Sequence, residues 1–139
     1  ALAADADGVH LGREDGDPGT ARERIGPGKL IGVSCYNELA RAQQALNMGV
    51  DYIAFGAVYP SSVKPHAVKA DLDLFQQTRA LMAAMPEPHP GIVAIGGITP
   101  ENAPPLVQAG ATSVAVINGL FEANDIRAQA QRFNHAFEA

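Results

Sequence analysis

The sequence has 139 residues, of which 47% are hydrophobic and 18% are charged, and this is the composition of an ordinary folded domain rather than of a disordered chain. The net charge of −5 at pH 7 comes from acidic residues scattered along the chain, without the clustered Lys and Arg that binding to nucleic acid or to an anionic membrane requires. We therefore expect no nucleic acid partner and no membrane partner.

The cysteine content indicates a reducing compartment. Cys35 has no second cysteine with which to form an internal disulfide, and no His or Cys spacing resembles a metal-ligand motif, so a cytoplasmic location is expected. No apolar run approaches the roughly 20 residues that span a bilayer. Residues 1–4 lack the charged and apolar regions of a signal peptide, so we expect the chain to be neither secreted nor anchored.

Five apolar stretches alternate with segments of helical length. The stretches are predicted to be strands, over residues 7–12, 29–34, 49–56, 91–96 and 110–117. Apolar spacing and capping residues predict helices over residues 37–48, 71–85, 99–110 and 125–137, with a short apolar turn around Leu120 and Phe121. Asn37 is the expected cap of the first of these helices and Gly49 its C′ glycine, while Thr99 and Pro100 suit the start of the third.

Strands that alternate with helices form parallel β/α units, and five units with short connections predict an α/β protein of the (β/α)8 TIM-barrel type. Such a barrel closes at eight strands and typically needs about 250 residues, so residues 1–139 are predicted to be the C-terminal portion of a single phosphate-binding barrel domain, about its last five units. An open doubly wound sheet is the alternative, but it needs a reversal of strand order that the sequence does not reveal.

A partial barrel would expose two strand edges and an apolar inner face. We therefore expect such a chain to aggregate, to form a homo-oligomer with a second copy, or to belong to a longer chain. The last is the interpretation that we favour.

Glycines follow the last two predicted strands. Gly96 and Gly97 follow the fourth strand, and Asn118 and Gly119 follow the fifth and lead into a short helix. Glycine lets backbone N–H groups approach an anion closely, and two adjacent final strands with a short extra helix are the usual phosphate site of these barrels. Each motif alone is equally consistent with a tight turn, but together they favour a phosphate site.

Two other loops after strands carry polar groups. The loop over residues 56–66 offers Ser61, Ser62 and Lys64, which suit phosphate or pyrophosphate oxygens, although ordinary loop composition is the alternative. The loop over residues 12–18 offers three carboxylates within four residues, from Glu14 to Asp17, and such hard oxygen ligands suit Mg²⁺ shared with substrate phosphates. These carboxylates would otherwise cap the following helix.

Three further residues near the predicted strand ends have simple interpretations. Ser34 would either donate to a ligand or cap a turn. Cys35 is expected to be a packed small hydrophobe, and His10, inside an apolar strand, a core histidine.

Five motifs resemble those of thiamine phosphate synthases, in the same order and with similar spacing over essentially the whole chain. They are DGVHLGRED at 7–15, GVS at 32–34, FGAVYPS at 55–61 with Lys64, IGGIT at 95–99 and VIN at 116–118. The resemblance implies an enzyme that joins a pyrimidine diphosphate to a thiazole phosphate with Mg²⁺, releasing pyrophosphate. It also implies a dissociative path through a pyrimidine-methyl cation, for which the protein mainly positions ligands and stabilises charge.

The resemblance assigns roles to residues by position. Asp15 matches a Mg²⁺ ligand, and Ser34 and Lys64 match catalytic residues that contact the pyrimidine diphosphate. The positions that match the thiazole phosphate site are Ser61, Ser62, Val63, Gly97, Ile117 and Asn118.

The sequence departs from the family pattern at several points. Val63 stands where many members have Thr, and Asn118 stands where Ser is usual. The family's first three strands are absent, and with them an Arg/Lys pair, an Asn-Asp pair that supplies another Mg²⁺ ligand, and part of the pyrimidine pocket. We therefore expect this chain alone to be incomplete as a synthase.

Three alternatives remain open at this point. The sister family of thiazole tautomerases shares the barrel and the phosphate site but looks to rely on a His at the position of Tyr36, which counts mildly against it. Another phosphate-binding barrel enzyme is a broader alternative, in which Asp15 and the 60–64 segment would have no set purpose. A non-catalytic phosphate-binding fragment is the third.

Overall fold

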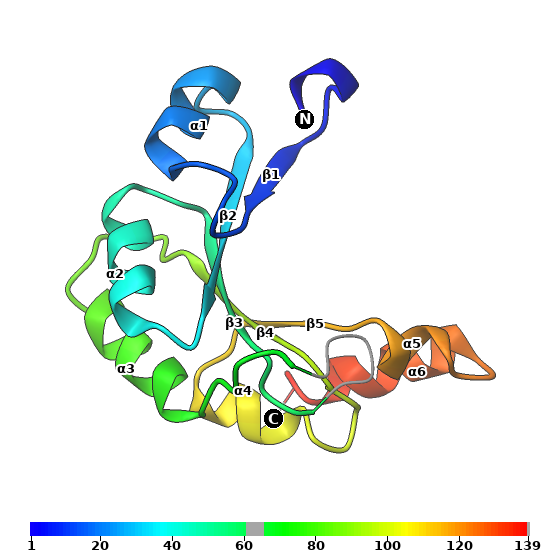
Figure 1. The fold of residues 1–139 in the computed structure, drawn as a ribbon. Coiled ribbons are helices and arrows are strands. Elements are labelled where there is room, and N and C mark those ends of the chain that lie inside the picture. The colour runs from blue at the N-terminus through cyan, green and yellow to red at the C-terminus, as the bar shows by residue number, and fades with distance from the viewer. Residues whose placement is uncertain (61–65, 139) are drawn as a thin grey trace.

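Five parallel strands form one sheet in the order β1-β2-β3-β4-β5, so that each strand pairs with the next one along the chain (Figure 1). The structure is a computed structural model that describes residues 1–60 and 66–138. Its strands are β1 (Gly8–Leu11), β2 (Leu30–Tyr36), β3 (Tyr52–Gly56), β4 (Gly91–Ile95) and β5 (Ser113–Ala115). Its helices are the 3-10 turn η1 (Leu2–Ala4), then α1 (Pro18–Ile25), α2 (Leu39–Asn47), α3 (Asp73–Met82), α4 (Pro104–Ala109), α5 (Asn118–Phe121) and α6 (Ile126–His135).

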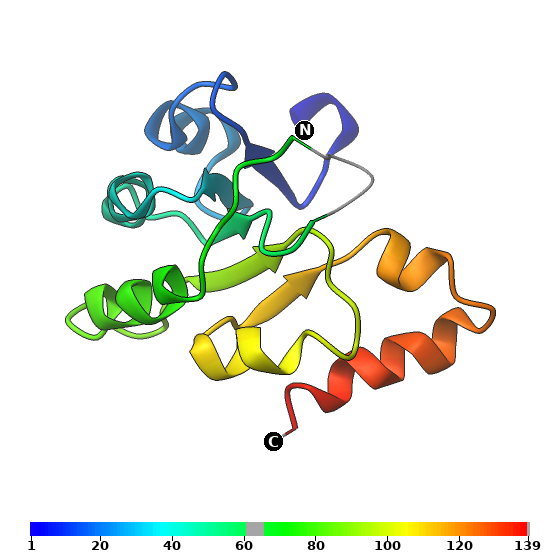
Figure 2. The ribbon, with the colours of Figure 1, turned by 60° about the horizontal axis from the view of Figure 1, so that its bottom comes forward.

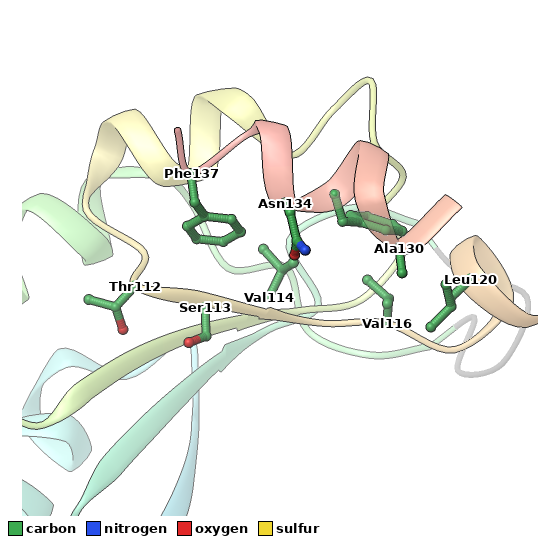
Figure 3. A pocket seen from close by; sticks show the side chains of 9 residues that line it. Thr112, Ser113, Val114, Val116, Leu120, Ala130, Asn134 and Phe137 are labelled. Carbon is green, nitrogen blue, oxygen red and sulfur yellow. The ribbon is translucent and has the colours of Figure 1, made fainter. Parts of the chain in front are cut away.

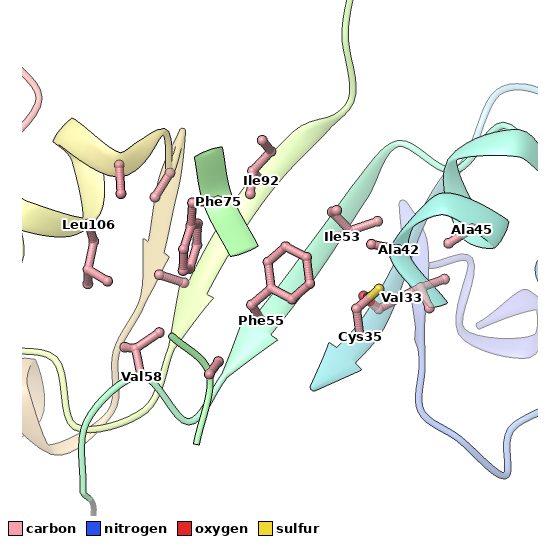
Figure 4. Close-up of a cluster of buried hydrophobic side chains, with 14 of the residues drawn as sticks. Val33, Cys35, Ala42, Ala45, Ile53, Phe55, Val58, Phe75, Ile92 and Leu106 are labelled. Carbon is pink, nitrogen blue, oxygen red and sulfur yellow. The ribbon is translucent and has the colours of Figure 1, made fainter. Parts of the chain in front are cut away.

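Helices α1 to α4 follow one another along one side of the sheet, and the core lies between them and the strands (Figure 2). The strand register pairs Val33 with Ile53 and Ile53 with Ile92, so these three side chains form one buried row. The row exists because side chains alternate between the two faces of a strand. Phe55 meets Phe75 of α3 edge to face in the same layer, with ring centroids 5.4 Å apart (Figure 4).

The opposite face of the sheet is open in this chain. Leu30 is 54% exposed and Ile95 is 40% exposed, although both lie within strands. Alternation places these residues on the face of the sheet opposite to helices α1 to α4, where no helix of the described residues lies over them. This α/β sheet of parallel units agrees with the sequence prediction, whereas closure into a barrel stays a prediction.

Several predicted boundaries are confirmed. Gly49 follows α2 with a φ of +70°, and Gly110 ends α4 with a φ of +119°, the backbone region that favours glycine. Asp125 caps α6, because its carboxylate accepts a hydrogen bond of 2.9 Å from the backbone N–H of Ala128.

Two predicted helix starts are wrong. Helix α2 begins at Leu39 after Glu38, so Asn37 is not its cap. Helix α4 begins at Pro104, because the backbone N–H of Thr99 donates to Asn102 in a separate turn.

Of the helices in the described ranges 1–60 and 66–138, none has the length and apolar character needed to cross a bilayer.

Candidate active site

The ends of all five strands open into one cavity of about 1070 Å³. Parallel strands place their carboxyl ends at one edge of the sheet, which is why segments distant in sequence meet there. The lining residues come from all five strand ends: residues 12–15, Ser34 and Tyr36, Ala54, residues 56–57, Pro60, residues 67–68, residues 95–99, residues 115–119 and Glu122.

Five of the predicted site residues line this cavity together: Asp15, Ser34, Gly97, Ile117 and Asn118. The other four, Ser61, Ser62, Val63 and Lys64, lie outside the described residues. Pro60 and Ala67, which are described, line the same cavity.

Only part of the predicted carboxylate cluster faces the cavity. One oxygen of Asp15 accepts a hydrogen bond of 2.6 Å from the backbone N–H of Gly12, and both Asp15 and Glu14 line the cavity. Asp17 instead caps α1, accepting from the backbone N–H of Thr20 at 3.0 Å and from its hydroxyl at 2.6 Å. These hydrogen bonds hold the pKa of Asp17 below its usual value.

The prediction that three carboxylates of this loop suit Mg²⁺ is therefore wrong for Asp17. In residues 1–60 and 66–138, no three His, Cys, Asp or Glu side chains gather into a cluster that would hold a metal ion. Glu14 and Asp15 are the carboxylates of this loop that line the cavity, and a Mg²⁺ site at Asp15 stays a prediction.

A second group ties the Asp15 loop to the end of β2. The backbone N–H of Arg13 donates to the phenol oxygen of Tyr36 at 3.1 Å, and the Arg13 guanidinium lies 4.8 Å from the centroid of the Tyr36 ring. Arg41 of α2 donates from Nε to the carbonyl oxygen of Ser34 at 2.7 Å and from Nη2 to that of Gly12 at 3.3 Å. The sequence prediction missed these roles of Tyr36 and Arg41, because nothing in the local pattern indicates which backbone groups an arginine will reach.

His10 does not lie in the core, and this prediction is wrong. Its side chain is on the open face of the sheet, where Nε2 is 2.7 Å from Ser34 Oγ and Nδ1 is 3.0 Å from Tyr52 OH. Partial burial lowers the pKa of His10 below its usual value, and the negative charge of Asp15 partly opposes this. His10 and Tyr52 therefore belong to the surroundings of the predicted site residue Ser34.

The double glycine after β4 is required by close packing. Gly96 and Gly97 have φ angles of +106° and +60°. A Cβ on Gly97 would lie 2.3 Å from the carbonyl oxygen of Pro60, and one on Gly96 would lie 2.6 Å from the Cβ of Ala57. The segment after β3 thus lies directly against this turn, with the N–H of Tyr59 donating to Gly96 O at 3.1 Å.

The turns that follow β4 and β5 are in contact. A Cβ on Gly119 would lie 2.2 Å from the carbonyl oxygen of Ile98, so α5 starts against the 96–98 turn. Asn102 holds that turn in shape, because its side chain accepts from Thr99 N at 2.8 Å and donates to Gly97 O at 3.1 Å. The two halves of the predicted phosphate site are therefore brought together, and Asn102 is a supporting residue that the sequence prediction missed.

A smaller cavity of about 350 Å³ lies between β5 and α6 (Figure 3). Its polar side chains are Thr112, Ser113 and Asn134, and the rest of its lining is apolar. None of the predicted site residues lines it. The chemistry that the sequence predicts therefore belongs to the larger cavity.

Comparisons with known proteins agree on one family. The family model described as thiamine monophosphate synthase matches residues 1–120. The thiamine-phosphate synthase of Bordetella bronchiseptica is 55% identical over 137 residues, which are 99% of this chain and 63% of that protein. That of Methylobacillus flagellatus is 54% identical over 137 residues, covering 99% of this chain and 62% of the relative.

Solved structures show a similar pattern. The thiamine phosphate pyrophosphorylase from Pyrococcus furiosus superposes with a TM-score of 0.79 at 33% identity, covering 99% of this chain and 62% of that one. A crystal structure of 3-hexulose-6-phosphate synthase has a TM-score of 0.69 at 18% identity, a likeness of fold alone. The chain thus spans less than two thirds of the length of these relatives.

Proposed function

The chain belongs to the thiamine monophosphate synthase family, and from this premise we propose that the protein containing it joins a hydroxymethylpyrimidine diphosphate to a hydroxyethylthiazole phosphate. The products are thiamine phosphate and pyrophosphate. The observation that carries the proposal is that Asp15, Ser34, Gly97, Ile117 and Asn118, from four different strand ends, line one cavity.

The proposed fold of the whole protein is a (β/α)8 barrel of which this chain supplies about the last five units. The sequential parallel strand order and the uncovered face with Leu30 and Ile95 support this proposal. The remaining strands would then come from a segment outside these residues, consistent with the share of each relative that the chain spans.

The proposed reaction is a substitution at the methylene carbon of the pyrimidine. The carbon–oxygen bond to the diphosphate breaks, and its electron pair leaves with pyrophosphate. The lone pair of the thiazole nitrogen then forms the new carbon–nitrogen bond. No proton transfer is needed at the nitrogen, so the proposed task of the protein is to position the two substrates.

The residues of this chain would act by positioning and by charge. Ser34 would donate to an oxygen of the diphosphate, and Lys64 would balance its charge. The turn at Gly97 and the start of α5 at Asn118 would hold the thiazole phosphate, together with Ser61 and Ser62. The departures from the family pattern at Val63 and Asn118 would change only how that phosphate is held.

Asp15 would hold Mg²⁺, which when bound neutralises charge on the departing pyrophosphate oxygens. The buried Cys35, without a partner for an internal disulfide, supports a reducing compartment, so we place the reaction in the cytoplasm. The partners would be the two small-molecule substrates.

The test is synthesis of thiamine phosphate by the gene product that contains this sequence, with both precursors, with and without Mg²⁺. We expect activity only with Mg²⁺, and losses on the order of 100-fold in Asp15→Asn, Ser34→Ala and Lys64→Ala. Asp73→Asn, at an exposed position of α3, is the matched control and should keep full activity. Full activity without Mg²⁺, or in all three site variants, would contradict the proposal.

Calorimetry of the present chain with the thiazole phosphate tests the phosphate site separately. Binding heat is expected, because Gly97, Ile117 and Asn118 lie within these residues. An absence of heat at millimolar ligand would count against this site assignment.

A further inference from the structure

Three side chains from three adjacent strands form one hydrogen-bonded row. The phenol oxygen of Tyr52 on β3 is 3.0 Å from Nδ1 of His10 on β1, and Nε2 of His10 is 2.7 Å from Oγ of Ser34 on β2. Of the three, Ser34 lines the large cavity, whereas His10 and Tyr52 do not. The row therefore leads from the sheet to one polar group at the cavity wall.

The residue opposite Tyr52 makes this row possible. Gly32 pairs with Tyr52 on one side and with His10 on the other. A Cβ on Gly32 would lie 1.9 Å from Cζ of the Tyr52 ring, so the ring lies directly across this glycine and reaches β1. The His10 and Tyr52 rings are stacked, with centroids 5.5 Å apart and planes inclined by 27°.

A neutral imidazole has one donor and one acceptor nitrogen, so the row permits two proton arrangements. With the proton on Nδ1, His10 donates to Tyr52 and accepts from the Ser34 hydroxyl, which then offers only lone pairs to the cavity. With the proton on Nε2, Tyr52 donates to Nδ1, and His10 donates to Ser34. The hydroxyl hydrogen of Ser34 is then left for a ligand.

Two observations favour the second arrangement. The phenol of Tyr52 is a stronger hydrogen-bond donor than the aliphatic hydroxyl of Ser34. In the first arrangement, the Tyr52 hydroxyl hydrogen would also be left to solvent, because the contacts of the described residues give Tyr52 OH the one partner His10. In the second arrangement the hydrogens of Tyr52 and His10 both have acceptors within the row, and the hydroxyl hydrogen of Ser34, at the cavity wall, is available to a ligand.

We propose that Tyr52 and His10 are positioning residues that hold the His10 proton on Nε2 and thereby make Ser34 a hydrogen-bond donor to an anionic ligand oxygen. This inference rests on the proposed function, in which that oxygen belongs to a diphosphate. It assigns neither His10 nor Tyr52 a direct contact with the substrate.

The first test measures the tautomer of His10 by the ¹⁵N shifts of the imidazole in ¹⁵N-histidine-labelled chain, with His10→Gln to assign the resonance among the four histidines. The Nε2–H form is expected in the wild type, and a mixture of tautomers in Tyr52→Phe. Thr78→Val is the matched control, because it removes a hydroxyl that bonds to Leu74 O within α3, and it should leave the tautomer unchanged.

An Nδ1–H form in the wild type would overturn the proposal, as would an unchanged tautomer in Tyr52→Phe. Circular dichroism establishes that each variant is folded. If Tyr52→Phe does not fold, the wild-type tautomer alone decides.

The second test titrates the chain with inorganic pyrophosphate and Mg²⁺. We expect the His10 resonances to move in the wild type and to stay fixed in Ser34→Ala, and the Kd to rise about tenfold in Ser34→Ala. Because Tyr52 acts through Ser34, the double variant Ser34→Ala/Tyr52→Phe should bind as Ser34→Ala does. Losses that multiply would overturn the proposal, since they would show that Tyr52 acts independently of Ser34.

The outcomes separate this inference from the function on which it rests. His10 resonances that do not respond to pyrophosphate would overturn the role of Ser34 as a donor, whether or not the longer protein makes thiamine phosphate. The predicted tautomer and pyrophosphate response in a protein without synthase activity would instead contradict the proposed function.

Discussion

Nε of Arg41 donates a hydrogen bond of 2.7 Å to the backbone carbonyl oxygen of Ser34. Through Nη2 the same guanidinium reaches the carbonyl oxygen of Gly12 at 3.3 Å. One side chain of α2 thus joins the end of β1 to the end of β2. The relative positions of Asp15 and Ser34 therefore depend on a residue outside the cavity lining.

Replacing Arg41 by Lys should separate charge from geometry. Lysine keeps the positive charge but lacks the planar fork that reaches two carbonyl groups at once. We expect Arg41→Lys to lower the free energy of unfolding by about 1 kcal/mol, measured by urea denaturation, and Arg41→Met to lower it further. In the full-length protein, we expect both Arg41 variants to lose synthase activity even under conditions in which they remain folded.

The matched control for Arg41 is Arg127→Met, at an exposed position of α6. Arg127→Met should change neither the free energy of unfolding nor the synthase activity. Equal behaviour of the Arg41 and Arg127 variants would show that the two carbonyl contacts do not hold the site.

Gly97→Ala should be strongly destabilising. The new Cβ would lie 2.3 Å from Pro60 O in a residue with a φ of +60°, so strain of the left-handed backbone and a clash with backbone act together. We expect a loss of about 3 kcal/mol in thermal or urea unfolding.

Gly49→Ala provides the comparison for Gly97. Gly49 has a φ of +70°, but nothing lies within 4 Å of the position of its Cβ, so only the backbone strain of about 1 kcal/mol is expected. If both substitutions were equally destabilising, the close approach of Pro60 to the 96–97 turn would be without energetic effect.

Cys35 should be unreactive in the folded chain. Its side chain is fully buried, and burial raises the pKa of the thiol to about 11. Because the thiolate is the reactive form, about one Cys35 in a thousand would be ionised at pH 8. Labelling with a thiol-specific disulfide reagent should be slow at pH 8 and become rapid in denaturant. Rapid labelling of the native chain would contradict the packing at this position.

Stability should decline in mildly acidic solution through His10. The pKa of His10 in the folded chain lies below its usual value near 6.5, because of partial burial, so the unfolded chain binds more protons between those two values. The free energy of unfolding should therefore fall as the pH drops below about 6.5 and level off below the folded-state pKa. Urea denaturation at several pH values between 5 and 8 measures this dependence.

His10→Gln should flatten this part of the pH profile, whereas His89→Gln, at an exposed position before β4, should not. The same slope in the wild type and in His10→Gln would rule out His10 as the source. If the pH dependence disappeared in both His10→Gln and His89→Gln, it could not be assigned to His10 alone.

The sequence by itself determined the alternation of strands and helices and the strand-end positions that line the large cavity. Asp15, Ser34, Gly97 and Asn118 were predictable because each lies at or just past the end of an apolar strand, and the carboxyl ends of parallel strands meet at one edge of a sheet. Local capping rules were sufficient for Gly49 and Asp125, since those interactions span only a few residues.

Only the tertiary structure decided which side chains support the site. His10 meets Ser34 across 24 residues of sequence and Tyr52 across 42, so a strand pattern that places His10 within an apolar run does not reveal that it faces the open side of the sheet. For Asp17 a local interaction decided the outcome. The loop composition suggested this carboxylate as a metal ligand, but it caps helix α1 by accepting a hydrogen bond from the backbone N–H of Thr20. Local propensity fixes where strands end, but the partners of a side chain follow from register and packing, which arise only when distant segments are brought together.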